Sequence, residues 1–194
     1  MKLRIILFLF SISGFSQTQI TSYEQNLYDK ATSEINALDY LEVYDGLKNE
    51  NPEVVKYALK IKEKVIKETL EIYNQILDTL PNTKLLNRIN YDIARIYFRD
   101  GNSKLATEYY LKVLANPESI NSANQNEENY TRKEICINIA EIFIHDEDYL
   151  TALKYLDESK KYKVIFGCGN TAIENNERLN QLYSLCQSGI SKQK

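Results

Sequence analysis

Residues 91–117, YDIARIYFRDGNSKLATEYYLKVLANP, contain the pattern from which the fold can be predicted. Apolar residues recur at helical spacing in its first half, for example at Ile93 and Ile96, and again in its second half at Ala106 and Tyr110. The polar sequence RDGN stands between the two halves and contains a glycine, a residue that accepts the backbone angles of tight turns. The pattern therefore predicts two short helices joined by a turn.

The same pattern returns further along the chain at an offset of 46 residues. This offset divides into a unit of 34 residues and an insert of 12 residues, 121–132. Small residues recur at matching positions in both copies, and large side chains stand between them. The matching positions are Ala94, Tyr97, Gly101, Ala106, Tyr110 and Leu114 in the first copy, and Ala140, Phe143, Glu147, Ala152, Leu156 and Lys160 in the second.

A 34-residue helix–turn–helix unit with this alternation resembles the tetratricopeptide repeat. The small residues let the two helices approach closely, and the large ones fill the space toward the next unit. The best matching units are residues 87–120 and 133–166. The early Trp of the family is replaced by Asn90 and Cys136, and the turn Gly is Glu147 in the second unit.

The region before the repeats carries two helix starts. Thr21 and Glu24 fit a capping box, in which each side chain binds a free backbone amide of the other residue. A break is expected near Asp45–Gly46. The sequence Asn51-Pro52-Glu53 then predicts a second start, with apolar residues at helical spacing up to Leu80. One long helix is the first expectation, and two helices with a turn near Glu63–Lys64 are the alternative.

The remaining boundaries follow from similar signals. The polar stretch 118–130 is expected to be a solvated loop, followed by a helix that starts at the capping box Thr131–Glu134. A second box, Thr171–Glu174, predicts the start of a last helix that caps the array, and residues 189–194 form a frayed tail. The predicted fold is all-α, a short tetratricopeptide-like α-solenoid of antiparallel helix pairs over residues 22–188.

The N-terminus has the features of a secretory signal peptide. Lys2 and Arg4 precede a short apolar run, and Gly14 and Ser16 put small residues before a cleavage site at the end of residues 1–16. The run is too short to span about 30 Å of hydrocarbon. The ending GFSQ and the frequent Asn, Lys, Ile and Tyr resemble exported proteins of the Bacteroidetes. We expect a periplasmic or secreted protein that does not insert into the membrane after cleavage.

Composition and motifs argue against several functions. The net charge is -3 without a block of Lys or Arg, which disfavours binding to nucleic acid. The single histidine, His145, stands among consecutive carboxylates that do not converge on one ion. No nucleophile motif or phosphate-binding loop occurs, so we predict no enzyme activity, no cofactor and no metal site. Cys136 and Cys186 are expected to act as small hydrophobic residues on helix faces.

The resemblance implies a binding surface on the concave side, which is lined by the first helix of each unit. The expected ligand is a partner protein or peptide. Aromatic and arginine side chains are frequent anchors of such interfaces, and the alternative for Arg95 and Glu141 is a simple ion pair with each other. The predicted partner-binding residues are Arg88, Tyr91, Arg95, Phe98, Arg99, Asn138 and Glu141, and the same face would carry Asp92, Glu134, Ile137 and His145.

Three functions remain open on this reasoning. The first is a non-enzymatic scaffold that binds a partner protein or peptide on the concave face. The second is the sensory input portion of an envelope signalling system, against which the lack of a later transmembrane segment counts. The third is a structural homo-oligomer that associates through the wide apolar stripe at residues 53–80.

Overall fold

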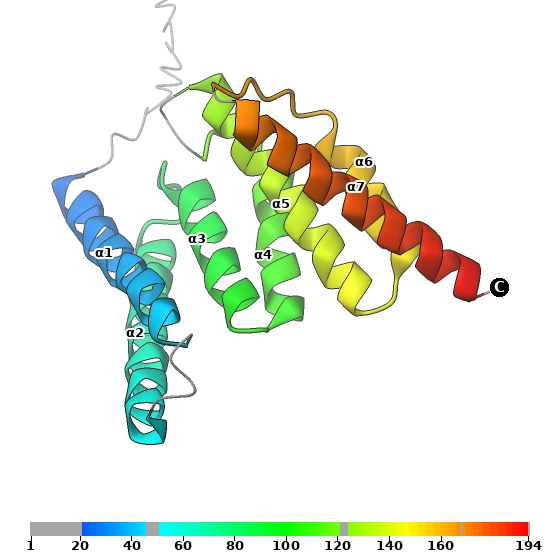
Figure 1. Ribbon diagram of the computed structural model, residues 1–194. Helices are drawn as coiled ribbons and strands as arrows, with labels where there is room; N and C mark the ends of the chain where they lie inside the picture. Colours follow the sequence, from blue (N-terminus) through cyan, green and yellow to red (C-terminus); the bar gives the residue numbers. More distant parts are fainter. Residues whose placement is uncertain (1–20, 46–50, 121–123, 168, 194) are drawn as a thin grey trace, which may run out of the picture.

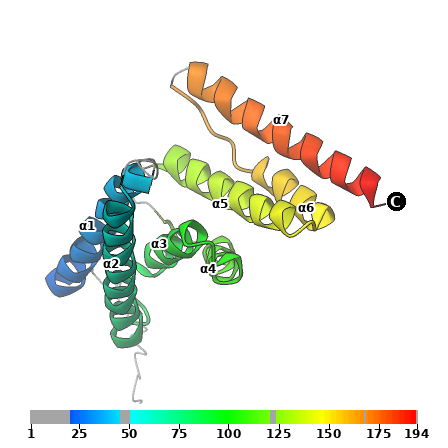
Figure 2. The same ribbon diagram turned by 60° about the horizontal axis from the view of Figure 1, so that its bottom comes forward.

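The computed structural model describes residues 21–45, 51–120, 124–167 and 169–193, and the predicted signal peptide lies outside these ranges. All regular secondary structure within them is helical, which confirms the predicted all-α class (Figure 1). Helices that follow one another in sequence lie side by side, and α7 contacts both α5 and α6 (Figures 1 and 2). The helices are α1 (Ser22–Asp45), α2 (Pro52–Thr79), α3 (Leu86–Arg99), α4 (Ser103–Ala115), α5 (Gln125–His145), α6 (Tyr149–Ser159) and α7 (Gly169–Lys192).

The first two helix starts have the predicted chemistry. The amide of Glu24 donates to Thr21 Oγ1 at 3.2 Å, and the amide of Thr21 donates to Glu24 Oε2 at 2.6 Å. At α2, the Asn51 side chain accepts from the amide of Glu53 at 3.1 Å. The helix that follows is unbroken over Pro52–Thr79. The single long helix is thus confirmed, and the two-helix alternative is wrong.

The start of α5 differs from the prediction. Asn124 caps this helix, because its Oδ1 accepts from the amide of Glu127 at 2.9 Å. Thr131 and Glu134 consequently lie within the helix, and the capping box predicted there is wrong. The predicted loop 118–130 is likewise wrong over its second half, which is helical from Gln125.

A buried ion pair explains why this polar segment is helical. Arg132 Nε donates to Glu128 Oε1 at 2.7 Å on consecutive turns of α5. The other carboxylate oxygen of Glu128 accepts from the amide of Ile120 at 2.8 Å. The guanidinium of Arg132 also donates to the carbonyl oxygens of Val113 and Asn116 at the end of α4. The pair fastens the α4–α5 connection to α5 and satisfies the buried charges, as buried ions require.

Helix α7 is longer than expected at both ends. It begins at Gly169, ahead of the capping box predicted at Thr171, and it continues to Lys192, whereas the sequence predicts an end at residue 188. The last turns pack against the start of α6. Gly189 lies against the ring of Tyr149 with no room for a Cβ atom, so a close contact holds this end of α7.

The turns of α3–α4 and α5–α6 share most of their backbone hydrogen bonds. In the first, the amide of Asn102 donates to the carbonyl of Tyr97 at 2.8 Å, and in the second Asp148 donates to Phe143 at the same distance. Asn102 and Asp148 then cap the next helix in the same way, with side-chain oxygens that accept from amides three residues on. The offset of 46 residues seen in the sequence thus recurs in the geometry of the two turns.

Among the described residues, the hydrophobic core consists of three clusters, and the buried residues of each come mainly from three consecutive helices. The first joins α1, α2 and α3, the second α3, α4 and α5, and the third α5, α6 and α7. Helices α3 and α5 each contribute to two clusters, so neighbouring helix pairs are held together through them. The small residues of the repeat pattern are fully buried where the helices approach, namely Ala94, Ala106, Ala140 and Ala152.

Candidate functional site

The candidate site is an aromatic cluster at which α3, α4 and α5 meet. The rings of Tyr91 and Phe98, two turns apart on α3, lie 6.4 Å and 6.3 Å from the ring of Tyr110 on α4. Asn138 on α5 donates through Nδ2 to the Tyr110 hydroxyl at 3.1 Å. Tyr110 is fully buried, whereas Tyr91, Phe98 and Asn138 are half-buried. We call Tyr91, Phe98, Tyr110 and Asn138 the inner cluster.

Burial also affects the ionisation of the two tyrosines of this cluster. Burial raises the pKa of Tyr110 above its ordinary value, and the hydrogen bond from Asn138 opposes this effect. Burial likewise raises the pKa of Tyr91, against the influence of the Arg95 charge. Both hydroxyls therefore stay protonated at neutral pH and act as neutral hydrogen-bonding groups.

Arg95 adds a positive charge to the edge of the inner cluster. Its guanidinium carbon lies 5.7 Å from the centre of the Tyr91 ring, a cation–π arrangement. Among the described residues, no carboxylate lies within ion-pair distance of Arg95. The predicted alternative, an ion pair between Arg95 and Glu141, is wrong.

Glu141 instead binds Arg178, which projects from α7 toward α5. Arg178 donates to Glu141 Oε1 at 2.8 Å and 3.0 Å and to Glu134 Oε2 at 2.9 Å. It also reaches Asn138 Oδ1 at 3.5 Å. Sequence reasoning missed Arg178, although Glu134 and Glu141 stand two helical turns apart on one face and signal a shared cation. Arg178 thus pairs with both acidic residues that were predicted to face a partner, and it offsets one of their two negative charges.

Asp92 is buried in a polar network and does not face outward as predicted. It is 7% exposed, and its Oδ2 accepts from the hydroxyls of Tyr28 at 2.8 Å and Tyr73 at 3.3 Å. Arg88 Nε donates to the Tyr28 hydroxyl at 2.6 Å, which connects α1, α2 and α3. Burial raises the pKa of Asp92, while the Tyr28 hydrogen bond and the charges of Arg88 and Arg95 oppose this rise.

The other predicted residues lie in different surroundings. Ile137 is fully buried in the third core cluster, so its placement on the binding face is wrong. Its position on α5 turns it toward α6 and α7. Arg99 is half-buried in the last turn of α3. His145 ends α5 as an exposed side chain whose Nδ1 lies 3.3 Å from Asp146 Oδ1.

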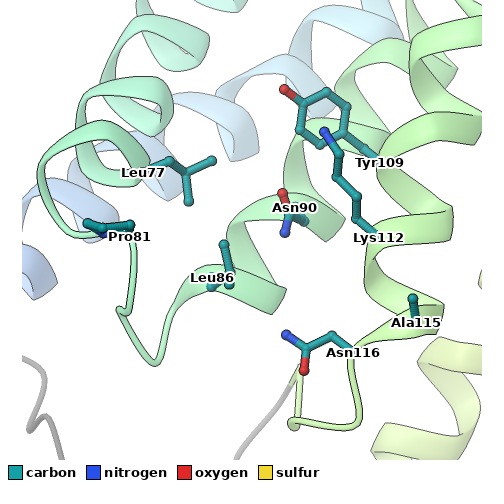
Figure 3. Close-up of a pocket in the computed structure, with 8 residues that line it drawn as sticks. All are labelled: Leu77, Pro81, Leu86, Asn90, Tyr109, Lys112, Ala115 and Asn116. Carbon is teal, nitrogen blue, oxygen red and sulfur yellow. The ribbon is translucent and has the colours of Figure 1, made fainter.

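Two of the cavities beside α3 lie near predicted site residues. The cavity in Figure 3 has a volume of about 570 Å³. Aliphatic side chains from α2 and α3 line one side of it. On the other side, the side chain of Lys112 lies along the ring of Tyr109. Asn90 lies between these sides. The second, about 510 Å³, has Tyr28, Lys84 and Arg88 in its wall. Arg88, a predicted partner-binding residue, therefore lines a cavity beside the Asp92 network.

The two cysteines of the described residues, Cys136 and Cys186, are buried and unpaired within helices, as predicted. Burial, with a smaller contribution from Glu158, raises the pKa of the Cys136 thiol to about 12. In the part of the chain that the structure describes, no three metal-binding side chains gather at one point. No helix of that part has the length and apolar character needed to cross a bilayer.

Comparison of the chain with family models, with curated proteins and with solved structures found no match.

Proposed function

We propose that this chain is a non-enzymatic scaffold that binds an acidic segment of a partner protein or peptide on the face shared by α3 and α5. The scaffold is a short tetratricopeptide-like solenoid in which the pairs α1–α2, α3–α4 and α5–α6 stack and α7 caps the array. It acts in the periplasm or outside the cell after removal of residues 1–16. The matching turns and the three linked core clusters support the solenoid.

The binding proposal depends on a difference between α5 and α3. The charged side chains of α5 named below have an oppositely charged partner, whereas Arg95 on α3 has none among the described residues. On α5, Glu134 and Glu141 are both occupied by Arg178. On α3, Arg95 lies beside the half-buried ring of Tyr91 without an acidic partner among the described residues. The face therefore presents a cation next to aromatic surface, and an acidic ligand complements this arrangement.

The inner cluster also favours a peptide over a small ion. Tyr91 and Phe98 are two turns apart, about 10 Å along the helix axis. Each is half-buried against Tyr110, so each offers one side of its ring from a fixed position. Rigid aromatic side chains that need little further ordering are effective anchors for an extended chain. A ligand that spans both rings is several residues long.

Selection from a random peptide library tests the proposal. The immobilised mature chain should enrich peptides that combine Asp or Glu with apolar residues, and Arg95→Glu should remove the acidic preference. Lys104→Glu, an exposed change of equal charge on α4, is the matched control and should leave the selected peptides unchanged. Identical selections by the parent chain and the Arg95 variant would contradict the proposal.

A further inference from the structure

Helix α2 carries opposite charge on its two halves. Residues 52–65 contain four lysines and two glutamates, whereas residues 66–79 contain three carboxylates and one lysine. This order opposes the helix macrodipole, which favours acids near the N-terminus and bases near the C-terminus. The lysines at 64 and 67 form i,i+4 pairs with Glu68 and Glu71, but these pairs are exposed and contribute little. Contacts within the helix therefore do not account for this charge pattern.

The N-terminal half of α2 also extends past the rest of the fold. In Figure 1 its first turns lie beyond the turn that joins α3 and α4. Leu59 in this part is 44% exposed. Because Leu59, Glu63, Ile66 and Leu70 follow one another at steps of four, three and four residues, they share one face of the helix. The exposed leucine thus belongs to the same stripe as residues that pack against the first core cluster.

The C-terminal half of this face contains a groove of about 380 Å³ where α2 meets the end of α3. Its apolar lining comes from Ile66, Leu70 and Tyr97, and three of its polar residues are acidic against one lysine. The groove is thus apolar with an acidic surround. The full lining is Glu63, Ile66, Lys67, Leu70, Glu71, Asn74, Tyr97 and Asp100.

We propose that α2 pairs antiparallel with α2 of a second copy of this chain, so that the protein is a two-fold symmetric dimer. Leu59 of each copy enters the groove beside Leu70 of the other, and the symmetry axis passes near residue 65. In this arrangement Lys60 faces Glu71, and Lys56 lies toward Asp78. All four charged side chains are exposed on the same face of α2, and each contact occurs twice.

A second copy fits the charges better than an unrelated partner. A single helix supplies both the basic half and the acidic half, so antiparallel pairing matches both halves at once, whereas parallel pairing would place like charges together. The pairing also covers Leu59. It leaves the face of α3 and α5 at the inner cluster out of the contact, so dimer formation and peptide binding are separate properties with separate tests.

Light scattering of the mature chain at micromolar concentrations tests the dimer. The parent chain should have twice the monomer mass, and a monomeric parent chain would overturn the proposal. Two variants then report on the surface. Lys56→Glu/Lys60→Glu makes both halves of α2 acidic, and Glu71→Lys/Asp78→Lys makes both halves basic. Each variant alone should be monomeric because like charges face each other.

Mixing the two variants gives the decisive result. The acidic and basic helices complement each other, so the mixture should return to the mass of a dimer, and circular dichroism should show equal helix content in all samples. A monomeric mixture of folded variants, or variants that remain dimeric alone, would overturn the proposed pairing. Lys104→Glu/Lys154→Glu, with the same charge change on α4 and α6, is the control and should stay dimeric.

Discussion

Gly101 and Glu147 occupy the same position in two equivalent turns, and both adopt a left-handed backbone with φ of 76° and 59°. The two turns share most of their backbone hydrogen bonds, so the position adopts this conformation with either residue. Glycine adopts it without strain, whereas a residue with a Cβ atom pays about 1–2 kcal/mol. The second turn therefore keeps the geometry of the first against the preference of its own side chain.

The first prediction concerns this strain. Glu147→Gly should raise the free energy of unfolding by about 0.5–1 kcal/mol, because the left-handed strain is relieved and part of the gain is lost to the flexibility of glycine in the unfolded chain. Gly101→Ala should lower it by about 1 kcal/mol. Urea unfolding measures both. Gly167→Ala, which meets no neighbouring atom and has no positive φ, is the control and should change stability little.

The second prediction concerns the buried pair of Glu128 and Arg132. Arg132→Met should lower the free energy of unfolding by about 3–5 kcal/mol, because it leaves a buried carboxylate without its counter-ion. Lys112→Met breaks the exposed pair with Glu108 at the same i,i+4 spacing and should cost at most about 1 kcal/mol. Chemical unfolding of the two variants compares them. Equal losses would show that burial does not govern the strength of these pairs.

These residues also show what could be predicted from the sequence. The turns and the buried alanines were predictable because they depend on local spacing, which a single chain displays directly. The start of α5 was not, since the Glu128–Arg132 pair stabilises this polar helix through a contact of Arg132 with α4 that the spacing of residues does not reveal. A solvated loop and a helix with buried charges have similar composition.

In the candidate site, too, some residues could be placed from helical spacing and others could not. Tyr91, Arg95 and Phe98 do lie on one face of α3, as helical spacing predicts. The burial of Asp92 could not be predicted, because its partners Tyr28 and Tyr73 come from helices that do not resemble the repeat. Such pairing over long sequence distances leaves no periodic signal.

The third prediction concerns the pH dependence of the Asp92 network. Since the pKa of Asp92 is raised in the folded chain, the native state binds the proton more tightly than the unfolded chain does. The contribution of Asp92 to stability therefore falls as pH rises from the unfolded value of about 4 through the folded pKa. The Asp92→Asn variant has no carboxyl group at this position and does not lose this contribution. The free energy of unfolding of the variant, minus that of the parent chain, should therefore increase with pH across that range.

Urea unfolding at a series of pH values measures this difference for Asp92→Asn, and carboxylates common to both proteins cancel. Asp157→Asn is the control of opposite sign, because hydrogen bonds from Lys160 and Tyr183 lower the pKa of Asp157. Its stability relative to the parent should decrease as pH rises through the folded pKa of Asp157. A difference for Asp92→Asn that is flat or decreases with pH would contradict the assignment of the network.

The fourth prediction concerns Arg178, which joins the cap to the proposed binding face. Arg178→Gln should lower the free energy of unfolding by at most about 1 kcal/mol, because the side chain is partly exposed and solvent screens its ion pairs. The larger effect should be on recognition. Loss of the guanidinium leaves Glu134 and Glu141 uncompensated near the inner cluster, so repulsion should weaken the binding of acidic peptides.

Titration of one acidic peptide, chosen by the library selection, separates the two effects of Arg178→Gln. The affinity should fall by about ten-fold, equivalent to about 1.4 kcal/mol, and the additional substitutions Glu134→Gln and Glu141→Gln should restore it. Restoration follows because the triple variant has no unpaired carboxylate at positions 134 and 141 to repel an acidic peptide. If the triple variant binds as weakly as Arg178→Gln, then Arg178 contacts the peptide itself, and its role is not the neutralisation of α5.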